Sequence, residues 1–329
     1  MDNQILLTTR IRLARNFKGF PFVPTIGREE VEEAKSLLYH SLDGDQRPWY
    51  YHELKYLSKQ EILYAMEENL ISPQLMKNRE ISSYYTSQEG EVIQFMEEDH
   101  LRASCLRKGS HLKEEYRHLK GILSLIEEAI PFSFHKKMGY LTTSPTNVGT
   151  GLRASSMLHL PALARSGMGP IHKSATRMGF VLRGMKGEGS EAMGHLYQIS
   201  NERTLGLTEE EFIQRADSLS QELMELELRK RKELYLDHLI ELEDMVHRSY
   251  GILRNARMLD YREALDHLSY VLLGVELSLL KPKKSFDFYD TVLALAKAHL
   301  QQEWGSILDE KSTMIYRANK ARALMKEVL

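Results

Sequence analysis

The pattern of apolar and polar positions changes character near residue 200. Before that point, short strand-like runs with alternating apolar and polar residues are mixed with helical segments and glycine-rich turns. From Thr208 onward, apolar residues recur almost without a break at helical spacing. The pattern predicts an α+β domain over residues 1–207, followed by an all-helical domain over 208–329.

Local signals place several elements in the first domain. Ser58 and Glu61 form a capping box, which predicts a helix that runs to about Leu70. The segments 80–87 and 91–106 flank a short polar turn and predict an antiparallel strand pair. Helical periodicity over 111–130 predicts a helix that stops before a proline.

The second domain begins with another capping box, Thr208 with Glu211, and the pattern predicts one long amphipathic helix through Val246. Asp260 starts a further helix. Residues 281–284 (KPKK) predict a linker, and two more helices are expected between it and Leu329.

The stretch 94–105 (QFMEEDHLRASC) places much charge in a predicted strand. A period of two puts Glu98 and Arg102 on one face, together with His100, and the other two acids, Glu97 and Asp99, on the opposite face. Taken alone, this pattern is typical of a cross-strand ion pair.

Further arginines occur in strand-like or glycine-rich contexts, namely Arg10, Arg12, Arg153 and Arg183. Arg153 follows the turn 149–151 (GTG), whose backbone N–H groups can approach an anion. Arg183 precedes a glycine-rich loop that contains Glu188, and the loop is predicted to be mobile. A lone arginine is usually a surface residue, but several of them with two isolated glutamates indicate a polyanion clamp around a cationic acceptor. Phosphoryl transfer needs such a combination.

Composition limits the alternatives. The chain has 329 residues, is 42% hydrophobic and carries a formal net charge of -2, which favours a soluble protein with no nucleic-acid or membrane partner. The single cysteine, Cys105, and an N-terminus unlike a signal peptide predict a cytoplasmic location. No P-loop, dinucleotide fingerprint, HExxH or CxxC motif is present, so no protein-bound metal site is expected.

Five motifs in order resemble the phosphagen (guanidino) kinase family: TTRIRLARN, EEDHLR, SPTNVGTGLRASSM, RGMKGEGSEA and YQISNERTLGLTEEE. The family fold is an antiparallel sheet flanked by helices. The C-terminal helices are similar to the dimerisation and phosphoarginine-sensing domain of one branch, the bacterial protein-arginine kinases of the heat-shock and quality-control system. That only seven residues precede Thr8 also favours this branch, because kinases of small guanidino compounds carry a helical domain there.

The resemblance implies specific roles. Arg10, Arg12, Arg102, Arg153 and Arg183 would hold the phosphates of ATP, whose Mg²⁺ would be bound mainly through the nucleotide. Glu98 would be the catalytic carboxylate, and Glu188 would grip the guanidinium from the loop. The remaining implied nucleotide contacts are Thr8, Thr9, Ile11, Ala154, Ser155, Ser156, Met157, Gly184, Met185, Lys186 and Gly187. Protein substrates bearing arginine, a homodimer, an activator protein and a Clp-type chaperone or protease are the implied partners.

The chain departs from the family pattern at a few positions. Ser144 replaces a cysteine that would lie near the guanidinium, and Asn69 replaces a histidine near the nucleotide. Met96 replaces an asparagine. In the last domain, the phosphoarginine-binding RDxxRA motif reads TMIYRA, which keeps only Arg317 and Ala318.

Three hypotheses follow. The first is an ATP-dependent kinase of arginine side chains in proteins. The second is the same chemistry on free arginine or another small guanidino compound. The third is a weak or inactive kinase-like adaptor, which the changes at Ser144, Asn69 and 313–318 motivate.

Overall fold

A computed structural model describes residues 4–45, 47–184 and 192–329, and these residues form two compact units. The arginine unit comprises residues 8–155 and 200–217. The helical unit comprises residues up to 7, 156–199 and 218–329. The domain boundary predicted between 207 and 208 follows secondary-structure content rather than compactness, and it stays a prediction.

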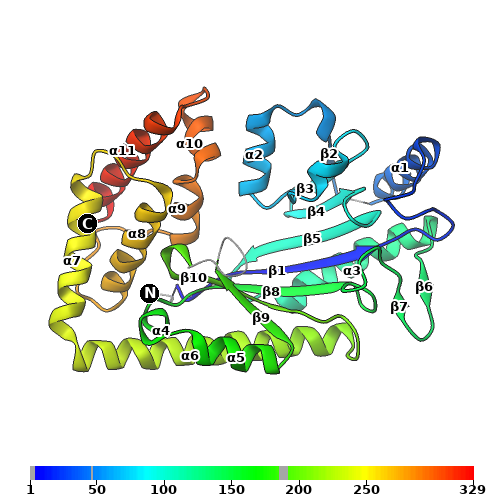
Figure 1. Cartoon of the computed structure of the whole chain (residues 1–329). Coiled ribbons are helices and arrows are strands. Elements are labelled where there is room, and N and C mark those ends of the chain that lie inside the picture. The colour runs from blue at the N-terminus through cyan, green and yellow to red at the C-terminus, as the bar shows by residue number, and fades with distance from the viewer. Residues whose placement is uncertain (1–3, 46, 185–191) are drawn as a thin grey trace. The chain divides into compact units, whose positions relative to one another are not determined.

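The arginine unit is built on an antiparallel sheet in which the strand order is β2-β3-β4-β5-β1-β8-β10 (Figure 1). The strands are β1 (Leu6–Arg15), β2 (Trp49–Glu53), β3 (Ser83–Ser87), β4 (Glu91–Phe95), β5 (Leu101–Lys108), β8 (Leu152–His159) and β10 (Leu196–Asn201). Strands β1, β8 and β10 also have residues in the helical unit. A separate hairpin joins β6 (Phe134–His135) to β7 (Gly139–Tyr140).

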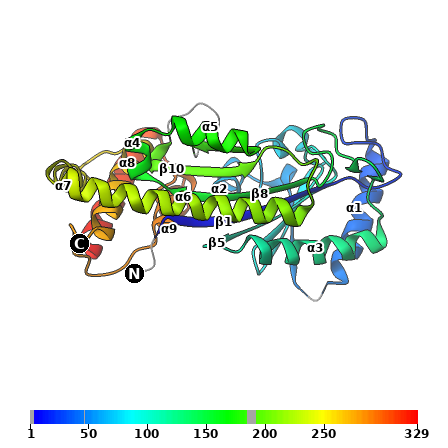
Figure 2. The ribbon, with the colours of Figure 1, turned by 90° about the horizontal axis from the view of Figure 1, so that it is seen from below.

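Helices cover one face of this sheet. They are α1 (Arg28–Asp43) and α3 (Leu112–Ala129), which pack on each other, and α3 also lies against β5 (Figure 2). The apolar stripe of α3, which includes Leu119, Leu123 and Ile126, is buried. Helix α2 (Lys59–Glu67) and the 3₁₀ turns η1 (Leu54–Tyr56) and η2 (Leu75–Asn78) surround a smaller core near β3 and β4. The face of the sheet away from α3 is therefore available for polar side chains.

In the helical unit, β9 (Phe180–Gly184) is the edge strand and pairs with β10. A 3₁₀ turn, η3 (Met193–His195), precedes β10. Its helices are α4 (Pro161–Ser166), α5 (Gly169–Arg177), α6 (Glu209–Asp237), α7 (Leu239–Asn255), α8 (Tyr261–Glu276), α9 (Phe288–Ala294), α10 (Lys297–Trp304) and α11 (Glu310–Val328). Side chains of α7, α8 and α11 share one hydrophobic core. Helix α5 runs beside α6 (Figure 2).

Several helix predictions are confirmed. The capping box of Ser58 and Glu61 is present at the start of α2, and Thr208 with Glu211 forms the second one. Asp260 caps α8 by accepting a hydrogen bond from the backbone N–H of Glu263. The helix predicted over 111–130 is α3.

Two helix predictions are wrong. The expected single helix from 212 to 246 is broken at His238, whose φ of -139° is not helical, into α6 and α7. The break lets Leu242 and Val246 of α7 join the core against α8, and this burial outweighs the continuity of one helix. After residue 284 the chain forms three helices, α9, α10 and α11, rather than two.

The strand predicted over 91–106 is also corrected. The chain leaves β4 at Phe95, bends through residues 96–100 and returns as β5. Met96 adopts a φ of +57°, and the two strands pair with Gln94 opposite Arg102. The acids of the EED run therefore lie in a turn, where alternation along a strand does not apply.

Within the described ranges, no helix is long and apolar enough to cross a membrane.

Candidate active site

Four of the five predicted arginines converge on one face of the arginine unit. Arg10 and Arg12 alternate along β1 with buried residues of the other face. Arg102 lies opposite Ala14 in the β1–β5 register, on the same face. Burial lowers the pKa of the Arg12 guanidinium well below its ordinary value, and the charges of Arg10, Arg102 and Arg153 lower it further. These guanidinium groups are thus close enough to repel one another.

The arginines differ in their partners. Arg10 donates to the backbone oxygen of Asn69 at 3.0 Å, and Arg153 donates to Ser200 Oγ at 2.9 Å. Arg102 forms an ion pair with Glu97. In contrast, no described residue accepts a hydrogen bond from Arg12, and its Nε is buried. The carboxylate of Glu97 offsets part of this repulsion, but it is paired with Arg102. A half-buried cation with three cationic neighbours and no acceptor is costly, so the site favours the binding of an external anion.

The turn 96–100 is fixed by two buried acids. Glu97 accepts hydrogen bonds from Ser72 Oγ at 2.5 Å and from the backbone N–H of Glu98 at 2.9 Å. Asp99 accepts from Asn16 Nδ2 and from the backbone N–H of Thr143, both at 2.6 Å. Glu97 and Asp99 therefore hold the turn in place.

Glu98 differs from its two acidic neighbours because its side chain is half-buried and no described residue donates a hydrogen bond to its carboxylate. Burial raises the pKa of Glu98. The charges of Asp99 and Glu97 raise this pKa further, whereas the charge of Arg102 lowers it. A carboxylate with a raised pKa and free oxygens is suited to accept a proton. The turn that positions Glu98 is held by Ser72 and Asn16, which are distant in sequence and bind its two acidic neighbours.

The positions that depart from the family pattern have ordinary local roles. Asn69 adopts a φ of +60° just after α2 and contacts Arg10 through its backbone and side-chain oxygens. Ser144 Oγ lies 2.8 Å from Thr146 Oγ1, within the turn that precedes β8. Met96 is fully buried. Replacing histidine by Asn69 therefore leaves the chain with an acceptor for one of the clustered arginines.

Other predicted nucleotide contacts are distributed more widely. Thr9 and Ile11 point to the α3 side of the sheet, away from Arg10 and Arg12. Thr8, Ala154 and Ser155 are buried, and Ser156 and Met157 belong to the helical unit. Arg183 and Gly184 lie on β9 of the helical unit, while Met185, Lys186, Gly187 and Glu188 lie outside the described residues.

The turn 149–151 has a different role from the one predicted. The backbone N–H of Gly149 donates to the oxygen of Tyr140 at 3.2 Å, and that of Thr150 donates to the oxygen of Thr204 at 3.0 Å. The expectation that these N–H groups face an anion is therefore wrong. Gly151 is needed for packing, because at its φ of +59° a Cβ would lie 2.6 Å from the oxygen of Ala14.

Two residues after the arginine motifs complete the cluster, and the sequence did not identify them individually. Ser200 accepts the hydrogen bonds of Arg153. Asn201 accepts from the backbone N–H of Ala154 and donates to the oxygen of Leu152. Both belong to the quoted motif YQISNERTLGLTEEE, which was the available signal.

Beneath the arginines, Glu115 of α3 is fully buried and bonds to Thr9. Burial raises the pKa of Glu115 to about 7. Thr9 Oγ1 lies 3.0 Å from both Gly109 O and Glu115 Oε1 and accepts from the N–H of His111. A hydroxyl has one proton, so all three bonds form only when Glu115 is protonated and donates.

This arrangement predicts a stability effect. Because the folded-state pKa of Glu115 is raised, its contribution to stability is complete at acid pH and is lost as pH rises through 7. Glu115→Gln, whose amide donates at every pH, should raise the free energy of unfolding by about 3 kcal/mol at pH 8 relative to wild type, because the pKa rises from 4.5 to about 7 and each unit corresponds to about 1.4 kcal/mol. The difference should vanish near pH 4, below the ordinary pKa of the carboxyl group. Urea denaturation at both pH values measures it, and a gain that is equal at both would contradict this origin.

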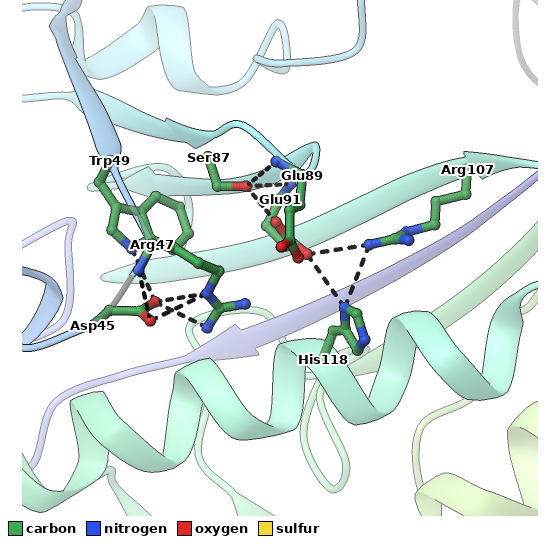
Figure 3. Close-up of polar contacts among 8 residues, drawn as sticks. All are labelled: Asp45, Arg47, Trp49, Ser87, Glu89, Glu91, Arg107 and His118. Carbon is green, nitrogen blue, oxygen red and sulfur yellow. Dashed lines mark hydrogen bonds and ion pairs between the residues drawn. The ribbon is translucent and has the colours of Figure 1, made fainter.

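A second buried acid, Glu91, is the centre of a polar cluster on the same unit (Figure 3). Its Oε1 lies 3.4 Å from Arg107 Nη2 and 3.5 Å from His118 Nδ1, and Ser87 Oγ donates to its other oxygen. Burial opposes the charge, but the Ser87 hydrogen bond and nearby cations lower the pKa of Glu91 overall.

Ligand atoms of Glu91, Glu89 and His118 lie within 4.8 Å of one another, as in a metal site. However, Arg107 Nη2 also donates to His118 Nδ1 at 3.3 Å, so a guanidinium already supplies the positive charge at this point. The cluster therefore stands as an ion-pair network that joins β3, β4, β5 and α3.

Sequence comparison identifies the fold family. Residues 30–230 match the model of the ATP:guanido phosphotransferase C-terminal catalytic domain, and 239–328 match that of the protein-arginine kinase McsB C-terminal domain. The chain belongs to the ATP:guanido phosphotransferase family. It is 35% identical to a protein-arginine kinase of Clostridium tetani, over 99% of this chain and 97% of the relative. Identity to that of Clostridium acetobutylicum is 38%, over 96% and 95%.

Solved structures of phosphagen kinases share this fold. Lombricine kinase matches with a TM-score of 0.61 and 25% identity, over 69% of this chain and 67% of that one. The substrate-free duplicated taurocyamine kinase of Schistosoma mansoni matches with a TM-score of 0.62 over 86% of this chain and 48% of that one. At 20% identity, the latter supports the fold alone. The phosphotransferase fold and the kinase identity predicted from the sequence are thus confirmed.

Arg317 and Ala318, the two residues that match the phosphoarginine motif, are buried in the helical unit. Arg317 of α11 is buried, donating from Nε to the backbone oxygen of Leu295 at 2.8 Å and from Nη1 to that of Leu259 at 3.0 Å. Its guanidinium also lies over the ring of Tyr261. Ala318 is fully buried.

Arg317 should therefore behave as a structural residue. Arg317→Met would leave two buried carbonyl oxygens without donors, and we expect a loss of about 2–4 kcal/mol in the free energy of unfolding. Lys326→Met, at an exposed position of the same helix, is the control and should leave the free energy of unfolding unchanged. A phosphoarginine titration that stabilises wild type but not Arg317→Met would contradict the assignment.

Proposed function

We propose that this kinase transfers the γ-phosphoryl group of ATP to arginine side chains of protein substrates. The observation that carries the proposal is the unpartnered guanidinium of Arg12 among three other arginines, which creates a site for a polyanion. The names of the relatives, protein-arginine kinases that align over almost the whole chain, support the choice of acceptor.

The chemistry follows from the charges. Arg10, Arg12, Arg102 and Arg153 would bind the phosphates and offset the charge that develops in the transition state. A guanidinium is protonated at ordinary pH and is a poor nucleophile. Glu98 would align one of its nitrogens with the γ-phosphorus and take the proton that this nitrogen loses as the N–P bond forms and the bond to ADP breaks. Arg183 and Glu188 remain proposed members of the same machinery.

Mg²⁺ would accompany the nucleotide. The groups around Arg12 are predominantly cationic and would not hold a bare divalent ion, whereas the phosphates of ATP would bring their own. When bound, the ion supplies further positive charge to the phosphates.

The test is incubation of the full chain with Mg-ATP and an unfolded, arginine-rich protein. We expect acid-labile phosphoarginine in the product by mass spectrometry. Absence of phosphoarginine from a preparation that binds ATP would refute the proposal. Parallel ADP-release assays with free arginine separate protein substrates from small guanidino compounds, and turnover only on free arginine would favour the second class.

The biological setting is proposed on the resemblance alone. A cytoplasmic stress-response role, with an activator protein and a Clp-type chaperone or protease as partners, fits the relatives. A homodimer through the C-terminal helices is proposed as well, and a size-exclusion mass equal to one chain would contradict it.

A further inference from the structure

A groove of about 990 Å³ lies within the helical unit, between the second half of α6 and the end of α8. Its α6 wall consists of Leu228, Arg231, Lys232, Tyr235 and Leu236. This spacing places all five on one face of the helix. The opposite wall consists of Val275, Leu277, Leu280 and Pro282, in and after the last turn of α8.

The apolar side chains of the α6 wall are open to solvent. Leu228 is 45% exposed, Tyr235 40% and Leu236 66%, and Ile240 at the start of α7 is 74% exposed. Single exposed apolar residues are common, but Leu228, Tyr235 and Leu236 all line the same groove, and several exposed apolar side chains at one groove mark an interaction site.

The buried charges of the groove are bonded to one another. Arg231 is 3% exposed and donates from Nε to Glu227 at 2.7 Å, while its Nη1 pairs with Glu276. Glu227 also accepts the backbone N–H groups of Ala162 and Leu163. The excess of one carboxylate over the guanidinium lies on the buried side chain of Glu227, where two backbone N–H groups bind it, so this charge does not face a partner.

The rim has unbalanced positive charge. Lys232 and Lys281 are exposed, and neither has a carboxylate within ion-pair distance in the described part of the chain. In contrast, the nearby Lys284 is paired and lies 2.6 Å from Glu327. Two free ammonium groups beside an apolar floor complement an acidic, apolar ligand.

We propose that this groove binds an acidic amphipathic helix of a partner protein. The stripe from Leu228 to Leu236 spans about 12 Å, which matches two to three turns of a helix. Apolar side chains of that helix would insert between α6 and the end of α8, and its carboxylates would reach Lys232 and Lys281. This is the helix-in-groove mode of recognition, and it is a binding function separate from phosphoryl transfer.

The test uses two labelled peptides of about 18 residues with leucine at helical positions i, i+3, i+4 and i+7. One carries glutamate at the other positions and one carries lysine. By fluorescence anisotropy with the full chain, we expect the glutamate peptide to bind at least about tenfold more tightly. Lys232→Glu combined with Lys281→Glu should reverse this preference, and Leu236→Asp should weaken binding of the glutamate peptide by about tenfold or more.

Matched controls lie outside the groove in the same unit. Ile307, which is 73% exposed, is changed to Asp, and Lys311 is changed to Glu. Both should bind the glutamate peptide as wild type does. All variants should keep wild-type kinase activity, which reports an intact fold.

Three outcomes would overturn the proposal. The first is equal binding of the two peptides, or binding that the groove variants leave unchanged. The second is a fall in size-exclusion mass for Leu236→Asp, which would assign the groove to a second copy of the chain. The third is lysine-dependent binding to vesicles that contain phosphatidylserine without binding of the glutamate peptide, which would assign it to a membrane surface.

Discussion

Glu98→Gln should reduce the turnover number for arginine phosphorylation by about 10²–10⁴-fold while leaving ATP binding intact. The Glu98 carboxylate accepts no hydrogen bond from a described residue, so it is available to a substrate guanidinium. An amide of the same shape cannot take a proton. Mass spectrometry of phosphoarginine and a separate nucleotide-binding titration measure the two quantities.

The rate of the wild-type enzyme should depend on pH, and the ionisation of Glu98 determines the direction. Burial and the neighbouring acids raise the pKa of Glu98, and only its ionised form accepts a proton. The rate should therefore fall as pH drops through this raised pKa, and the residual rate of Glu98→Gln should lack that step.

Glu80→Gln is the matched control, because Glu80 is an exposed acid of the same unit. It should leave the rate unchanged. Phosphorylation by Glu98→Gln at the wild-type rate would remove Glu98 from the mechanism. Cells that lack the protein and are rescued equally by wild type and Glu98→Gln would support a role as an adaptor.

Arg12→Met should have opposite effects on function and stability. Loss of one phosphate-binding cation should lower kcat/KM for ATP by about 10²–10³-fold. Without nucleotide, however, the variant should be more stable than wild type by about 1 kcal/mol, because a half-buried cation with no described acceptor and three cationic neighbours has been removed. Steady-state kinetics and urea denaturation measure the two effects.

Arg28→Met, at an exposed position on α1, serves as the control and should change neither quantity. Saturating Mg-ATP should stabilise wild type and Arg28→Met more than Arg12→Met. If Arg12→Met were less stable without nucleotide, the guanidinium would have an unrecognised acceptor, and the polyanion argument would fail.

The sequence predicted the local elements that depend on short-range physics. Capping at Ser58 and Thr208 was readable because both partners of each hydrogen bond lie within four residues. The alternation of Arg10 and Arg12 along β1 was correct for the same reason, since neighbouring side chains of a strand point to opposite faces. Motif order was sufficient to identify the phosphotransferase family.

Alternation failed where tertiary contacts overrode it. The alternating pattern predicted a continuous strand through residues 96–100, but the chain turns at Met96. The buried acids Glu97 and Asp99 hold this turn by hydrogen bonds to Ser72 and Asn16, which are distant in sequence. The helix predicted through residue 246 breaks at His238 because the residues after it gain more by packing on α8. The residues that contact the turn and the helix break are distant in sequence, so a local sequence pattern cannot reveal them.

The sequence by itself therefore determined which residue types are present and the family to which the chain belongs. Only the tertiary structure decided which arginine lacks a partner. Arg10, Arg102 and Arg153 are bonded to Asn69, Glu97 and Ser200, whereas Arg12 has no acceptor among the described residues. The reason is that charge compensation depends on distances between groups that the fold brings together, and these distances are not encoded in any single segment.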